Sequence, residues 1–71
     1  MVQVKNKTLK DLRNEKNLSL SQVAYKLGIH SSYVGYLERA ERTLSIDRAA
    51  EMARIYGVSL DKIYELYQNA K

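Results

Sequence analysis

The side chains best suited to chemistry lie close together in the middle of the chain. Ser31, Ser32 and Tyr36 carry hydroxyl groups that donate or accept hydrogen bonds. Arg39 and Arg42 follow with guanidinium groups, which attract anions and donate hydrogen bonds in a planar fork. Together these groups suit the binding of a polar, negatively charged partner.

No residue pattern in the chain predicts catalysis. There is one histidine, His30, and no cysteine, so metal sites built on thiolates or histidines are not expected. The sequence has no phosphate-binding loop and no nucleophile, base and acid at a spacing typical of catalytic groups. We therefore expect no enzyme activity, no metal, no cofactor and no small-molecule ligand.

The net charge of +4 comes entirely from the first half of the chain. Residues 1–30 hold six Lys and Arg against two Asp and Glu, whereas residues 31–71 hold six of each kind. A basic surface attracts polyanions and releases their counterions on binding. This distribution favours a nucleic-acid partner, although the same charge would also serve solubility alone.

The length of 71 residues predicts one domain over residues 1–71, with a thin core. Because disulfides are excluded, the remaining supports are well-packed helices and self-association. No apolar run approaches the roughly 20 residues of a membrane span, and the N-terminus lacks the apolar region of a signal peptide. A cytoplasmic protein without membrane contact is expected.

Apolar spacing and capping residues predict a compact all-α domain of five short helices. Residues 1–6 form a terminal arm, and the helices are expected at 7–16, 19–28, about 31–39, 45–57 and from 59 onward. Ser19 and Gln22 fit the start of the second helix as a capping box. Gly28 fits its end, because glycine adopts the left-handed conformation without steric cost.

The second and third helices are joined by a short turn that contains glycine, which is the helix-turn-helix arrangement. The small Ala24 lets the two helices approach, and Val34 and Leu37 fix the crossing from inside. The polar side of the third helix then projects outward, where it fits a DNA major groove about 12 Å wide.

Residues 18–58 resemble the phage repressor and Cro type of helix-turn-helix domain, the xenobiotic-response-element or lambda repressor-like family. Ala24, Gly28, Val34 and Leu37 stand at the small, glycine and apolar positions of that family. The stretch ARIYGVSLD at residues 53–61 is similar to the family's A-x-x-L-G-V-S-L-D segment. The resemblance spans about residues 8–65 and implies a five-helix, repressor-like transcriptional regulator that binds double-stranded operator DNA.

Within this frame we expect two sets of DNA contacts. The outward positions of the third helix place four residues at the base edges: Ser31, Ser32, Gly35 and Tyr36. The expected phosphate contacts are Ser21, Gln22, His30, Arg39, Arg42 and Thr43. Since serine accepts and donates with little discrimination, DNA shape is expected to contribute to specificity.

Several positions depart from the family pattern or carry a second interpretation. Many members begin the second helix with a glutamine that meets a phosphate, and here this position is Leu20. His30 replaces the usual Ser or Thr cap, and it fits either a phosphate contact or an exposed turn. By resemblance, Arg13 and Glu38 form a partly buried structural pair.

The last helix, in residues 59–71, is the expected dimerisation element. We expect Leu60, Ile63 and Tyr64 to fill the core, which leaves Leu66 and Tyr67 at the rim as an interface. A homodimer would place two reading helices about 34 Å apart on a palindromic operator. The alternative is a protein–protein module, such as an antitoxin or antirepressor partner, that uses the same last helix.

Overall fold

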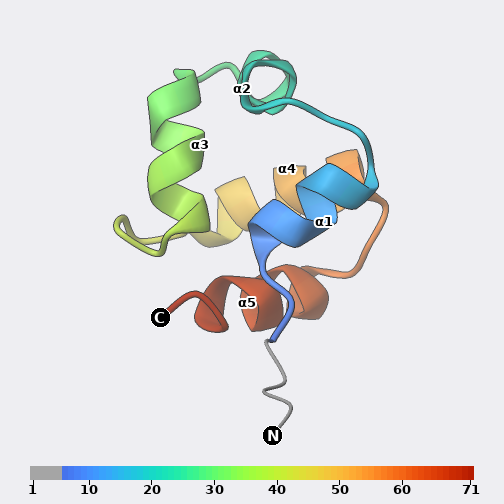
Figure 1. Cartoon of the computed structure of the whole chain (residues 1–71), viewed down its shortest axis with the longest axis vertical. Helices are drawn as coiled ribbons and strands as arrows, with labels where there is room; N and C mark the ends of the chain where they lie inside the picture. The colour runs from blue at the N-terminus through green and yellow to red at the C-terminus, as the bar shows by residue number, and fades with distance from the viewer. Residues whose placement is uncertain (1–5) are drawn as a thin grey trace, which may run out of the picture.

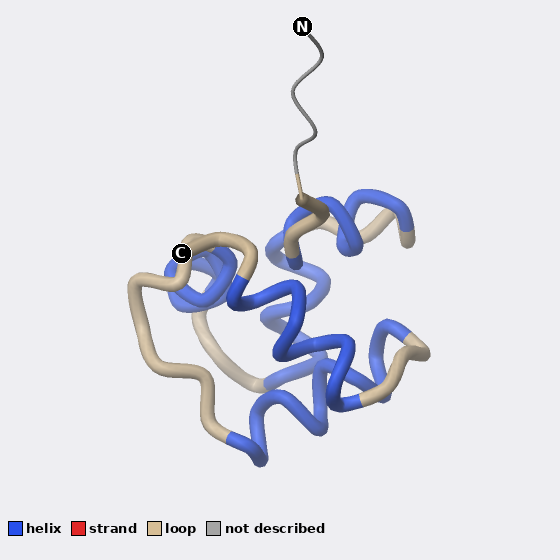
Figure 2. The backbone as a smooth tube through the Cα atoms, turned by 90° about the horizontal axis from the view of Figure 1, so that it is seen from below, coloured by secondary structure: helices blue, strands red, loops and turns tan. Residues whose placement is uncertain are grey.

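The computed structural model describes residues 6–71, and the predicted arm therefore lies almost wholly outside the described residues. This part of the chain contains five helices and loops only, as Figures 1 and 2 show, which confirms the all-α prediction. The helices are α1 (Leu9–Glu15), α2 (Leu20–Leu27), α3 (Ser31–Glu38), α4 (Ile46–Tyr56) and α5 (Leu60–Gln68). None of these helices has the length and apolar character needed to cross a bilayer.

Local sequence signals set the helix ends. The Ser19 hydroxyl accepts from the backbone N–H of Gln22 at 3.0 Å, and the Gln22 side-chain oxygen accepts from the Ser19 N–H at 2.7 Å. Thr8 and Asp11 form an equivalent capping box at α1. Gly28 ends α2 with φ of +71°, a left-handed backbone conformation that is unfavourable for residues with a side chain.

The core gathers apolar side chains from every helix, and α4 packs against both α2 and α5. The most buried large side chains come from all five helices: Leu9, Val23, Val34, Leu37, Met52, Tyr56, Ile63 and Leu66. In Figure 1, α3 lies at one side of the molecule next to α2, so that only part of its circumference faces this core.

The structure corrects the interpretation of α5. Leu66 is fully buried and Tyr67 is 5% exposed, so the expectation that they form a rim for a dimer interface is wrong. Leu60, expected in the core, is 37% exposed. The buried stripe is Ile63, Leu66 and Tyr67, and the loop after α3 accepts hydrogen bonds from α5. The Tyr67 hydroxyl donates to the Arg42 carbonyl at 2.7 Å.

Candidate nucleic-acid interface

The turn between α2 and α3 fixes how α3 is presented. After Gly28 the chain reverses, and the Ile29 N–H donates to the Ala24 carbonyl at 3.0 Å. Ala24 is 4% exposed, and Val34 on α3 is fully buried. This packing holds one side of α3 against α2 and leaves the opposite side facing outward, as the sequence predicts for a helix-turn-helix.

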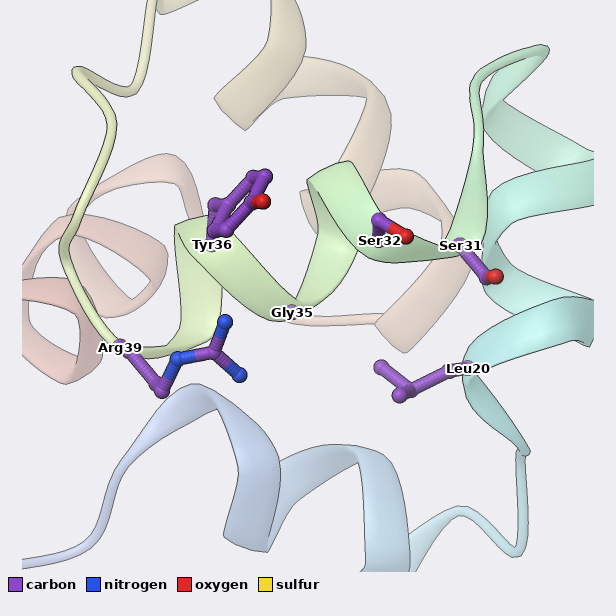
Figure 3. A pocket seen from close by; sticks show the side chains of 6 residues that line it. All are labelled: Leu20, Ser31, Ser32, Gly35, Tyr36 and Arg39. Atoms are coloured by element: carbon purple, nitrogen blue, oxygen red, sulfur yellow. The ribbon is translucent and has the colours of Figure 1, made fainter.

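Six residues line a shallow recess of about 300 Å³ on that outward side: Leu20, Ser31, Ser32, Gly35, Tyr36 and Arg39. In Figure 3, Gly35 lies near the middle, with Leu20 reaching over from α2 and Tyr36 on the other side of the α3 ribbon. Ser32 and Tyr36 are exposed and Ser31 is half-buried. The recess thus brings the four predicted base-reading residues together.

Gly35 differs from the other three residues, because it is buried. The Arg39 side chain lies over it: a Cβ atom at position 35 would be 3.2 Å from Arg39 Nη1. Gly35 thus lies on the outward side of α3, where the Arg39 side chain covers it in the free protein. Gly35 forms the floor of the recess.

The C-terminal end of α3 concentrates positive charge around one ring. The guanidinium carbons of Arg39 and Arg42 lie 5.5 and 5.0 Å from the centre of the Tyr36 ring. Arg39 Nε also lies 3.2 Å from a carboxylate oxygen of Glu41. Arg42 and the neighbouring Thr43 are exposed. These cations stand at the edge of the outward face, a position that suits phosphates rather than bases.

His30 is the N-cap of α3. Its Nδ1 atom accepts a hydrogen bond from the Ser32 N–H at 3.1 Å, while the residue stays exposed. In this bond Nδ1 is the acceptor, and Nε2 is not engaged by it. The sequence left open whether His30 contacts a phosphate or is only an exposed turn residue. The structure adds a third role, because His30 caps the start of α3.

Ser21 and Gln22 do not border the recess over α3. They line a second hollow of about 320 Å³ together with Tyr25 and Lys26, on the surface of α2. Tyr25 is 89% exposed. Sequence reasoning singled out neither Tyr25 nor Lys26, although a tyrosine outside the apolar stripe of α2 was a usable signal.

A buried ion pair joins the end of α3 to α1. Arg13 Nε and Nη2 donate to the two carboxylate oxygens of Glu38 at 2.6 and 3.2 Å, and Arg13 Nη1 donates to the Leu18 carbonyl at 3.0 Å. The side chains of Arg13 and Glu38 are 9% and 5% exposed. The hydrogen bonds that Arg13 donates to Glu38 raise the pKa of Arg13. The predicted pair is present and holds the angle of α3.

Tyr56 lies close to this pair and is 1% exposed. Burial raises the pKa of its hydroxyl, and the negative charge of Glu38 adds to the rise. Among residues 6–71 this hydroxyl finds no hydrogen-bond partner. Within residues 6–71, no three metal-ligating side chains come together.

Comparisons with known proteins agree with this geometry. Residues 9–63 match the model of the helix-turn-helix family. The chain is 33% identical over 55 residues to the control protein C.SmaI of Serratia marcescens, covering 78% of this chain and 66% of that protein. It is 36% identical over 58 residues to the uncharacterized HTH-type transcriptional regulator YobD of Bacillus subtilis, covering 82% of this chain and 52% of the relative. No solved structure matches the chain significantly.

Proposed function

Because the chain belongs to the helix-turn-helix family, we propose that it is a transcriptional regulator that binds double-stranded DNA sequence-specifically through α3. One observation carries this proposal. Val34 and Leu37 hold α3 from inside, while Ser32 and Tyr36 remain exposed on its outer side. A helix presented in this way fits the major groove and offers hydrogen-bonding groups to base edges.

The proposed phosphate contacts surround this helix. Arg39, Arg42 and Thr43 serve the C-terminal side of α3, and Ser21, Gln22 and His30 serve the side near the α2–α3 turn. For Gln22, the oxygen holds the α2 cap, so its amide N–H groups remain to donate to a phosphate. Phosphate contacts position the protein on the duplex, and base contacts then select the sequence.

We further propose that the protein acts as a homodimer on a palindromic operator, with its two α3 helices about 34 Å apart. Since Leu66 and Tyr67 fill the core of their own chain, the interface uses other residues. The chain spans about two thirds of one curated relative and half of the other, so this proposal concerns the DNA-binding part. The bacterial relatives and a DNA target favour a cytoplasmic location.

The alternative function, a protein–protein module with a foreign partner on α5, loses its main support. It requires an accessible apolar surface at Tyr64, Leu66 and Tyr67. Leu66 and Tyr67 are buried, and the Tyr64 hydroxyl donates to the Leu44 carbonyl at 2.9 Å. DNA binding through α3 has no such obstacle.

Selection of bound sites from random duplex DNA, read at two salt concentrations, tests the proposal. We expect one palindromic site to be enriched and the affinity to fall as salt rises. Ser32→Ala should change the preferred base at one position of each half-site, whereas Gln68→Ala, an exposed change on α5, should leave the site unaltered. If no sequence is enriched over random DNA, sequence-specific binding is excluded.

A further inference from the structure

On the basis of the proposed function, we infer that the recess over Gly35 receives the C5 methyl group of a pyrimidine in the major groove, with Leu20 as a specificity-determining residue. Thymine carries this group naturally, and 5-methylcytosine carries it after modification. The two share the same chemistry, so the test below separates them.

Leu20 supplies the first argument. It is the first residue of α2, directly after the Ser19 cap, where a polar side chain would be well solvated. Instead, an apolar side chain is half-buried and reaches toward the middle of α3 (Figure 3). Because the Leu20 side chain neither donates nor accepts a hydrogen bond, this side chain can contribute to DNA binding only through apolar contact.

Gly35 supplies the second argument. Only Gly28 and Gly57 among the glycines have positive φ, so the backbone of Gly35 does not require glycine. A glycine inside a helix is also less stable than alanine there. What glycine provides at this position is space, because a Cβ atom would project into the recess toward Arg39.

The chemistry of the lining selects the ligand. Leu20 and the Gly35 backbone form an apolar middle, with the hydroxyls of Ser31 and Ser32 at one end and Arg39 with the Tyr36 ring at the other. Of the groups that bases present in the major groove, only the C5 methyl is apolar. A polar base edge pressed against Leu20 would lose its water without a replacement partner. The recess of about 300 Å³ has room for a methyl group and the edge of its base.

The experiment measures binding to the selected site with each thymine replaced in turn by deoxyuridine, which removes only the methyl group. Burial of one methyl group predicts that each single replacement lowers the affinity about fourfold at either of two symmetry-related positions, one in each half-site. Leu20→Ala and Gly35→Ala should reduce this ratio to about one. Leu60→Ala is the matched control, since Leu60 also follows a serine cap as the first residue of its helix, and it should keep the fourfold ratio. Cytosine and 5-methylcytosine at the same pair test the second source, and a gain of similar size from the methyl group is expected there, because each comparison changes only that group.

A further variant separates this role of Gly35 from simple accommodation of Arg39. The variant combines Gly35→Ala with Arg39→Ala. If Gly35 only makes room for Arg39, then Gly35→Ala no longer changes the ratio of thymine to deoxyuridine affinity once Arg39 is gone. We expect the ratio still to fall to about one in that double variant. Equal affinity of the unaltered protein for thymine and deoxyuridine at every position would overturn the inference while leaving sequence-specific binding intact. Failure to enrich any site would remove both.

Discussion

The buried pair between α1 and α3 gives the most direct test of how the reading helix is held. Glu38→Gln keeps the size of the side chain but removes its charge, which leaves Arg13 as an unpaired cation that is 9% exposed. Breaking a buried pair in this way costs about 3–5 kcal/mol. The bond from Arg13 Nη1 to the Leu18 carbonyl survives, so we expect the lower end, about 3 kcal/mol.

This loss is large for a chain of 71 residues, whose total stability is expected near 4–11 kcal/mol. Urea unfolding followed by circular dichroism measures it, and the melting temperature should fall by about 12–24 °C. The matched control is Glu15→Gln, because Glu15 pairs with Lys7 at 2.8 Å while both side chains are exposed. That change should cost less than about 1 kcal/mol.

A double variant separates the loss of the pair from the presence of an unpaired charge. Arg13→Met combined with Glu38→Leu replaces both charges by apolar side chains, and it should recover most of the stability lost in Glu38→Gln. If Glu38→Gln is no more destabilising than Glu15→Gln, the pair does not hold α3, and its short distances carry no energetic weight.

Substitutions at three further positions have expected outcomes. Arg42→Ala should weaken binding equally across DNA sequences and reduce the salt slope by about one, whereas Arg54→Ala, an exposed change on α4, should not; an unaltered slope removes Arg42 from the phosphate contacts. Tyr56→Phe should maintain or raise stability by about 1 kcal/mol in urea unfolding, because the buried hydroxyl has no partner. Burial raises the pKa of Tyr56, so the unfolded chain loses this proton first, and stability should decrease above about pH 10 less steeply in Tyr56→Phe. Ala40 has φ of +57°, a left-handed conformation that is strained for a residue with a Cβ atom. Ala40→Gly should therefore stabilise the domain by about 1 kcal/mol, and a lower urea midpoint would show that this strain is absent.

The parts of the fold that sequence predicts well are those set by neighbours along the chain. The capping box of Ser19 and Gln22 and the left-handed Gly28 depend on residues a few positions apart, and the structure has both. The spacing of Val34 and Leu37 likewise predicts which side of α3 is buried, and both residues are buried in the structure. The opposite side must then face outward. The presentation of α3 is therefore readable from the sequence.

The orientation of α5 could not be derived in this way, because two stripes of helical spacing overlap in it. Residues 60, 63, 64 and 67 form one stripe, and 63, 66 and 67 form the other. The choice depends on where α4 and the loop after α3 lie. In the structure that loop accepts hydrogen bonds from Tyr64 and Tyr67, which turns Leu66 inward and exposes Leu60.

The recess over α3 illustrates a different limit, because it joins two features that look unrelated in the sequence. Leu20 stands out as an apolar residue directly after a helix cap, and Gly35 as a residue that weakens its helix. Fifteen positions separate them, and neither predicts the other. The turn at Gly28 brings α2 and α3 together so that both line one hollow. Local rules are broken most often where function requires it, and both departures lie on the surface that we propose to contact DNA.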